Sequence, residues 1–207
     1  MSELALYRKY RPKEFADVRG QDEIVSTLLR SIKDKNISHA YLFSGGRGTG
    51  KTTVARIFAA EIGSKPSDLY ELDGASNRGI DDIRELREGV ATMPFESPYK
   101  VYIIDEVHML TKEAFNALLK TLEEPPAHVV FILATTDREK VPETIISRCQ
   151  TFTFRQPGLT ELKDFAIEVA KEEKIKLDTP SADIVAMFGD GSYRDTLSVL
   201  EKVLISA

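Results

Sequence analysis

The sequence predicts an α/β domain with a parallel sheet flanked by helices, followed by a small helical domain. In the first part of the chain, short apolar segments alternate with segments of helical period, which is typical of a parallel sheet covered on both faces. After Gln156-Pro157-Gly158 only helical segments remain. We therefore expect one domain over residues 1–157 and a second over residues 158–207.

Helices are expected where apolar residues recur every three to four positions. In residues 21–35, for example, Ile24, Leu28 and Ile32 share one face, and the helix after Thr111 must end before Pro125, which cannot continue it. The predicted helices span residues 21–35, 51–62, 80–90, 111–122, 160–173, 181–188 and 194 to about 206.

Strands are expected in the short apolar runs between these helices. Residues 101–104 and 129–133 are apolar at every position, so both should be buried in the middle of the sheet. Residues 69–72 give a weaker strand pattern. The predicted strands are residues 41–43, 69–72, 101–104, 129–133 and 152–154.

The composition excludes several classes of protein. The only cysteine among 207 residues, Cys149, cannot form an internal disulfide or a Cys-rich zinc site. The first residues do not resemble a signal peptide, and no run approaches the roughly 20 apolar residues of a membrane span. We expect a cytoplasmic protein without a membrane partner.

The charge pattern argues against tight DNA binding by this chain alone, because the net charge is −5. A local basic cluster lies at Arg8, Lys9, Arg11 and Lys13. Two interpretations stay open at this point, namely a solvated arm and a segment that faces a nucleotide.

A phosphate-binding loop is predicted directly after the strand at residues 41–43. Residues 45–52 read GGRGTGKT, which fits the pattern G-x-x-x-x-G-K-[ST] between a strand and a helix. Backbone N–H groups of such a loop bind phosphate oxygens, Lys51 reaches the β- and γ-phosphates, and Thr52 is a ligand of Mg²⁺. The predicted ATP-binding residues of this loop are Gly45, Gly46, Arg47, Gly48, Thr49, Gly50, Lys51, Thr52 and Thr53.

Two carboxylates follow the buried strand at residues 101–104. Asp105 is expected to bind Mg²⁺ through its water shell, and Glu106 to polarise the attacking water. The alternative is that the pair only caps the following helix. A third strand ends at Thr135-Thr136, and either hydroxyl could orient the water or, alternatively, cap a helix near Pro142.

Two arginines are candidates for the additional positive charge that phosphoryl transfer needs. Arg148 precedes the last strand, and Arg194 opens the last helix. Periodicity does not distinguish between them, and the residues alone favour reading each arginine as a surface or salt-bridged residue.

Taken together, these motifs resemble the gamma/tau family of bacterial DNA polymerase III subunits, the motor ATPases of clamp loaders in the AAA+ superfamily. The P-loop alone is generic, whereas the ISRC and LEEPP segments are typical of clamp-loader ATPases, and AFNALLKTLEEPP with ATTD is typical of the bacterial branch. The resemblance covers nearly the whole chain, through residues 8–21, 39–56, 74–88, 99–126, 132–137, 146–150 and 191–197.

The resemblance implies roles that spacing alone does not give. It implies that Arg148 is an arginine finger acting in trans on a neighbouring subunit, and that Arg194 contacts the γ-phosphate of its own subunit from a helical lid. It favours Thr136 over Thr135 as the residue that senses the γ-phosphate. It also implies adenine contacts by Arg8, Tyr10, Arg11, Pro12 and Val18.

The sequence departs from the family pattern in two places. The family usually carries a four-Cys zinc module where this chain has only residues 61–68, so we expect no zinc; natural absence and removal by engineering both stay open, with natural absence favoured. The chain also ends after the lid helix, so the helical collar domain is expected to be missing and a monomeric state of this fragment is conceivable.

The function implied is that of a bacterial, cytoplasmic, Mg²⁺-dependent ATPase that loads the sliding clamp onto primed DNA. Its implied partners are delta, delta prime and further gamma/tau subunits, the clamp, and primer-template DNA held by the assembled ring. One alternative is a replication factor C small subunit or another AAA+ loader or remodeller. A non-hydrolysing assembly subunit is a further alternative, which the intact Lys51, Thr52, Asp105 and Glu106 argue against.

Overall fold

The computed structural model describes residues 4–77 and 79–206, and these residues fall into two compact units. The sheet unit comprises Gln21–Gly45 and Lys51–Phe154. The helical unit comprises the described residues up to Gly20, the loop Gly46–Gly50, and the described residues from Arg155 onward. The domain boundary proposed after residue 157 stays a prediction.

The sheet unit is built on five strands in the order β2-β3-β4-β1-β5, and every neighbouring pair is parallel. The predicted parallel sheet is therefore confirmed. The weak pattern at residues 69–72 has a physical reason, because β2 lies at the edge of the sheet and three of its five residues are exposed. The strands are β1 (Ala40–Gly45), β2 (Leu69–Asp73), β3 (Lys100–Asp105), β4 (Val129–Thr135) and β5 (Gln150–Phe154).

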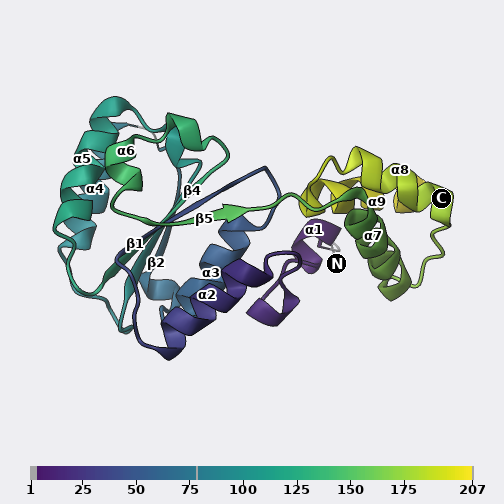
Figure 1. The fold of residues 1–207 in the computed structure, drawn as a ribbon, viewed down its shortest axis with the longest axis horizontal. Helices are drawn as coiled ribbons and strands as arrows, with labels where there is room; N and C mark the ends of the chain where they lie inside the picture. The colour runs from purple at the N-terminus through teal and green to yellow at the C-terminus, as the bar shows by residue number, and fades with distance from the viewer. Residues whose placement is uncertain (1–3, 78, 207) are drawn as a thin grey trace. The chain divides into compact units, whose positions relative to one another are not determined.

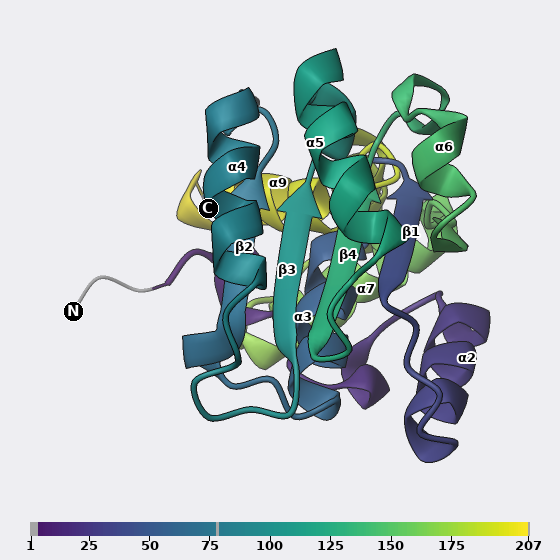
Figure 2. The ribbon, with the colours of Figure 1, turned by 90° about the vertical axis from the view of Figure 1, so that its left-hand side faces the viewer.

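Helices cover both faces of this sheet, as Figures 1 and 2 show. One face carries α2 (Asp22–Lys33) and α3 (Lys51–Glu61); the other carries α4 (Ile80–Val90), α5 (Lys112–Glu123) and α6 (Glu143–Ile146). Successive residues of β1 point to opposite faces. Tyr41 packs edge-on against Phe58 of α3, while Leu42 joins the core that includes Leu118 of α5. This two-sided burial explains why the central strands are apolar throughout.

The helical unit contains α1 (Leu6–Lys9), α7 (Leu159–Glu172), α8 (Thr179–Phe188) and α9 (Tyr193–Ser206). Leu6 lies in a core with Phe165 and Leu200, and the Leu6 N–H donates to Glu201 Oε1 at 3.2 Å. The four-residue α1 was not predicted from the sequence. It is too short to give a periodic signal, and its burial depends on residues almost two hundred positions away.

Four single turns of 3₁₀ helix complete the described structure: η1 (Phe15–Asp17), η2 (Pro66–Asp68), η3 (Val107–Met109) and η4 (Arg138–Lys140). Each of the seven helices predicted with bounds begins and ends within two residues of its predicted position. None of the helices in residues 4–77 and 79–206 is long and apolar enough to cross a bilayer.

The strand order positions the candidate site. β4 pairs with both β1 and β3, so the carboxyl ends of these three strands are adjacent at one edge of the sheet. Ser44 of β1 is in register with Thr135 of β4, and Ile104 of β3 with Leu133 of β4. The segments that carry Lys51, Asp105 and Thr136 therefore leave the sheet side by side, where parallel sheets bind ligands.

Candidate functional site

The glycine-rich loop joins β1 to α3. Gly48 and Gly50 have φ angles of +70° and +101°, which favour glycine. At Gly48 a side chain is also excluded by space, because a Cβ atom there would lie 1.8 Å from Ser192 Oγ in the same helical unit. The Thr49 hydroxyl donates to the Gly46 carbonyl at 2.9 Å and closes the loop on itself.

Lys51 is the first residue of α3 and is buried. Its ammonium group donates to the Gly45 carbonyl at 2.8 Å. An ammonium group is compact and strongly hydrated, so its burial needs oxygen partners. The lysine side chain is thus directed back to the end of β1, the same edge of the sheet from which the other candidate residues project.

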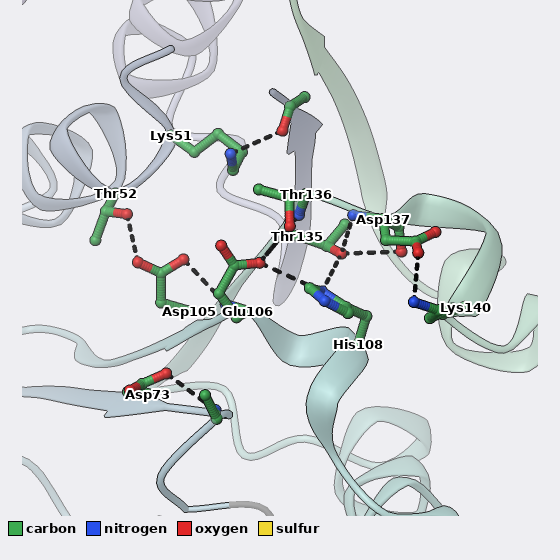
Figure 3. Close-up of polar contacts among 12 residues, drawn as sticks. Lys51, Thr52, Asp73, Asp105, Glu106, His108, Thr135, Thr136, Asp137 and Lys140 are labelled. Atoms are coloured by element: carbon green, nitrogen blue, oxygen red, sulfur yellow. Dashed lines mark hydrogen bonds and ion pairs between the residues drawn. The ribbon is translucent and has the colours of Figure 1, made fainter. Parts of the chain in front are cut away.

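Thr52 and Asp105 come together from α3 and β3. The Thr52 hydroxyl donates to Asp105 Oδ2 at 2.7 Å, and the Glu106 N–H donates to Asp105 Oδ1 at 3.0 Å (Figure 3). Gly74 approaches the same strand end, where its N–H donates to the Asp105 carbonyl at 2.7 Å. A Cβ atom at Gly74 would lie 2.7 Å from the Glu106 carbonyl oxygen, so a side chain there would disturb the carboxylates.

Glu106 has a strained backbone, with φ 46° and ψ 45° in the left-handed region. Such a conformation in a non-glycine residue costs about 1–3 kcal/mol and clusters at functional sites. The Glu106 side chain makes no capping hydrogen bond to η3. Instead, Glu106 Oε2 accepts from the Thr136 hydroxyl at 2.7 Å and from the Thr136 N–H at 3.2 Å. For Glu106 and Thr136, the geometry therefore favours hydrogen bonding to each other at the candidate site over the capping of a helix.

A further polar residue, His108, reaches this cluster from η3. Its Nδ1 lies 3.3 Å from Glu106 Oε2 and 3.0 Å from the hydroxyl of the fully buried Thr135 (Figure 3). Thr135 in turn binds the backbone of Asp137, not the site directly. Sequence reasoning gave His108 no role. The available signal was a histidine one short turn after two carboxylates that end a buried strand.

Asp137 closes the polar network at the end of β4. Lys140 donates to Asp137 Oδ2 at 2.8 Å, and this hydrogen bond lowers the pKa of the Asp137 carboxyl. Asp137 is consequently ionised near neutral pH. Its negative charge is compensated by Lys140 on the next turn.

The donor set at Thr52 and Asp105 fits a hard divalent cation. Mg²⁺ prefers oxygen ligands and is usually held by one or two protein groups together with waters and substrate phosphates. In the part of the chain that the structure describes, no group of three or more His, Cys, Asp or Glu side chains is placed to hold a metal ion. A hydroxyl and a carboxylate in contact match the Mg²⁺ arrangement, in which the nucleotide supplies further oxygens.

The other predicted residues lie elsewhere. Arg148 follows α6, where its guanidinium pairs with Glu123 Oε1 at 2.8 Å and donates to the Thr144 carbonyl at 2.6 Å. The structure therefore does not bring Arg148 into hydrogen-bond contact with Asp105 or Glu106. Arg194 opens α9 in the helical unit, and its side chain is exposed.

The predicted adenine-binding residues all belong to the helical unit. Tyr10 packs against the core of that unit, and its hydroxyl donates to Glu173, which also pairs with Lys9 at 2.7 Å. Burial and the contact with Glu173 raise the pKa of Tyr10, so the phenol stays neutral. The Arg8 guanidinium contacts its neighbour Tyr7, to whose hydroxyl Arg8 Nε donates at 3.1 Å.

Comparison with known sequences places the chain in a family. The family model described as DNA polymerase III, delta subunit, matches residues 20–76 and 64–158. DNA polymerase III subunit tau of Bacillus subtilis is 46% identical over 99% of this chain, and the tau subunit of Escherichia coli is 40% identical over 100% of it. The chain spans 40% and 35% of the lengths of these relatives.

Comparison with solved structures supports the fold. The RuvB Holliday junction branch migration motor of Thermotoga maritima superposes with a TM-score of 0.77, covering 95% of this chain and 65% of the other. Its sequence is 21% identical, so this likeness concerns the fold alone, namely a parallel sheet flanked by helices with a helical region after it. The chain therefore belongs to the DNA polymerase III subunit family that the matching model describes, and it is similar to gamma/tau subunits over almost its whole length.

Proposed function

We propose that this chain binds ATP with Mg²⁺ and hydrolyses it as the motor subunit of a bacterial DNA polymerase III clamp loader. The observation that carries the proposal is the 2.7 Å contact between Thr52 and Asp105, beside the buried Lys51 and the oriented Glu106. A phosphate loop, a hydroxyl–carboxylate pair and an anchored second carboxylate are the parts that P-loop ATPases use.

Each side chain has a distinct task in this proposal. The backbone N–H groups of residues 45–52 and the Lys51 ammonium bind the phosphates, while Thr52 and Asp105 hold Mg²⁺. When bound, Mg²⁺ neutralises charge on the β- and γ-phosphates. Glu106 accepts a proton from the water that attacks the γ-phosphorus, and Thr136 keeps the Glu106 carboxylate in place.

Two arginines complete the proposed reaction. Arg148 acts in trans on the ATP site of a neighbouring subunit, which requires it to leave Glu123 or to be presented by it. Arg194 contacts the γ-phosphate from a lid formed by residues 158–207, and residues 1–157 form the nucleotide-binding domain. The proposed adenine contacts of Arg8, Tyr10, Arg11, Pro12 and Val18 belong to the same account.

The proposed partners follow from the relatives. The chain spans only part of the relatives' length, so the following proposals concern the whole protein. It assembles with delta, delta prime and further gamma/tau subunits. The assembly acts on a sliding clamp and primer-template DNA in the bacterial cytoplasm. In such a ring several subunits would share the contacts with the DNA phosphates, which is compatible with a net charge of −5 on one chain.

The direct test is Glu106→Gln, with Lys51→Ala as the matched variant. The Gln variant should bind ATP with wild-type affinity, and its turnover should fall by about 10²–10⁴-fold because the proton acceptor is lost. The Ala variant should lose ATP binding itself. Binding is measured with a fluorescent ATP analogue and turnover by phosphate release. Wild-type turnover in Glu106→Gln would contradict the assignment of the base.

A further inference from the structure

Two hydrogen-bond donors and one histidine ring nitrogen lie around a single oxygen of the Glu106 carboxylate. Glu106 Oε2 receives the Thr136 hydroxyl at 2.7 Å and the Thr136 N–H at 3.2 Å, and His108 Nδ1 lies 3.3 Å away (Figure 3). Within the described residues no hydrogen bond reaches the other oxygen, Oε1. The carboxylate is thus held at one oxygen and open at the other.

The neighbours of His108 fix which ring nitrogen carries the proton. The Thr135 hydroxyl has a single proton, which it donates to the Asp137 carbonyl at 3.0 Å, while it accepts from the Asp137 N–H at 3.0 Å. Thr135 Oγ1 must therefore accept from His108 Nδ1 at 3.0 Å. Glu106 Oε2 is also an acceptor. Both neighbours require a proton on Nδ1.

We propose that His108 is a positioning residue whose Nδ1–H, bonded to Thr135 Oγ1 at 3.0 Å, also faces Glu106 Oε2 at 3.3 Å and so leaves Oε1 as the oxygen that receives the proton of the attacking water. The inference rests on the proposed ATPase function. Thr135 has the supporting task of directing the imidazole, because its own proton is committed to the backbone. Thr135 and Thr136 therefore act on the same carboxylate, one through His108 and the other directly.

The proton balance of the step assigns no transfer to His108. The water oxygen forms a bond to the γ-phosphorus, the bond from that phosphorus to the β,γ-bridging oxygen breaks, and one water proton passes to Glu106 Oε1. The products are ADP and phosphate. His108 keeps its Nδ1 proton throughout, and its effect is to hold Glu106 Oε2 and to restrict rotation of the carboxylate.

The first test measures the imidazole directly and needs no turnover. Long-range ¹H–¹⁵N spectra of the ¹⁵N-labelled chain report which nitrogen of each histidine is protonated. The sequence has three histidines, so the His108→Asn spectrum assigns the signals of His108 by their absence. We expect a proton on Nδ1 at pH 8. A proton on Nε2 with a bare Nδ1 would overturn the proposal.

The second test replaces His108 by Asn or by Gln, two amide side chains whose nitrogens differ by one bond in their separation from Cβ. The Asn amide nitrogen is two bonds from Cβ, as His Nδ1 is, whereas the Gln amide lies one bond further, like Nε2. We expect His108→Asn to keep kcat within about threefold of wild type, and His108→Gln to lose about tenfold or more, with ATP binding and KM unchanged in both. Turnover is measured on the complete assembly with its partner subunits.

The outcomes separate this inference from the proposed function. Equal kcat values for His108→Asn and His108→Gln would overturn the positioning role, whether both are active or both impaired. Glu106→Gln is measured in parallel. If it abolishes turnover while both His108 variants match wild type, only the inference fails; if it leaves turnover intact, the proposed function fails with it.

Discussion

The Thr52 hydroxyl donates to Asp105 Oδ2 across 2.7 Å, although the two residues lie 53 positions apart in the sequence. Thr52 is the second residue of α3, the helix that follows β1, whereas Asp105 ends β3, and β4 lies between β1 and β3 in the sheet. The contact therefore depends on the parallel strand order. It brings two oxygen ligands of the kind that Mg²⁺ prefers to one point.

Removing either oxygen should weaken the binding of Mg²⁺ at the candidate site. We expect Asp105→Asn and Thr52→Val to raise the Mg²⁺ concentration needed for half-maximal ATP turnover by about tenfold or more, since each removes one oxygen ligand. The measurement is a Mg²⁺ titration at fixed ATP. Thr52→Ser, which keeps the hydroxyl, is the control and should stay close to wild type. Unchanged titration curves for Asp105→Asn would exclude it as a ligand.

The hydroxyl of Thr136 should matter for turnover and not for binding. Thr136→Val keeps the shape but removes the donor to Glu106 Oε2, a hydrogen bond to a charged group worth about 1.5–3 kcal/mol. We expect kcat to fall by about tenfold to a hundredfold with KM for ATP unchanged. Thr136→Ser should retain most of the activity. A large rise in KM with normal kcat would show instead that Thr136 binds the nucleotide.

The fold was predictable because each signal is local or periodic. Apolar runs predicted the buried strands, and the helix after Thr111 begins where predicted because the Thr111 hydroxyl accepts from the Ala114 N–H at 3.2 Å. The α1 helix was missed, since its stability comes from the contact of Leu6 with distant residues. Sequence periodicity carries no information about such a contact.

The site was predictable as far as strand ends define it. Lys51, Thr52, Asp105 and Glu106 follow directly from a motif and from buried strands that end in polar residues. His108 was not predicted, because its contact with Glu106 depends on a 3₁₀ turn and on a left-handed backbone at Glu106. A choice between Thr135 and Thr136 also needed coordinates, since only alternate residues of a strand share a face.

Acid should destabilise the fold through Asp68. Burial alone would raise the pKa of this carboxyl, but hydrogen bonds from the Glu96, Phe95 and Ser97 N–H groups outweigh it and lower the pKa to about 2. Because the unfolded pKa is about 3.9, the ionised carboxyl stabilises the folded state above that value, and this stabilisation is lost as pH falls toward 2.

The matching experiment compares wild type with Asp68→Asn across this range. We expect Asp68→Asn to have the lower Tm at pH 7 and the Tm difference to shrink between about pH 4 and pH 2. Thermal unfolding followed by circular dichroism measures both proteins in the same buffers. A Tm difference that does not change with pH would mean that ionisation of Asp68 has no part in holding residues 95–97.

Two phenylalanines provide a matched test of the core. Phe58 is fully buried and packs edge-on against Tyr41, whereas Phe95 is 85% exposed. Phe58→Ala should lower the free energy of unfolding by about 3–5 kcal/mol, and Phe95→Ala should change it by about 0.5 kcal/mol or less. Urea denaturation followed by circular dichroism gives both values. Similar losses in the two variants would contradict the described packing of α3 on the sheet.

The central claim is that this site hydrolyses ATP and that a neighbouring subunit completes it. The most direct measurement is ATP turnover per subunit as a function of protein concentration, for wild type, Lys51→Ala, Arg148→Ala and an equal mixture of the two variants. We predict turnover that rises with concentration, collapses in each variant alone and partly returns in the mixture, because one variant keeps an intact site and the other an intact arginine. Turnover that is independent of concentration and unchanged in Arg148→Ala would contradict the account.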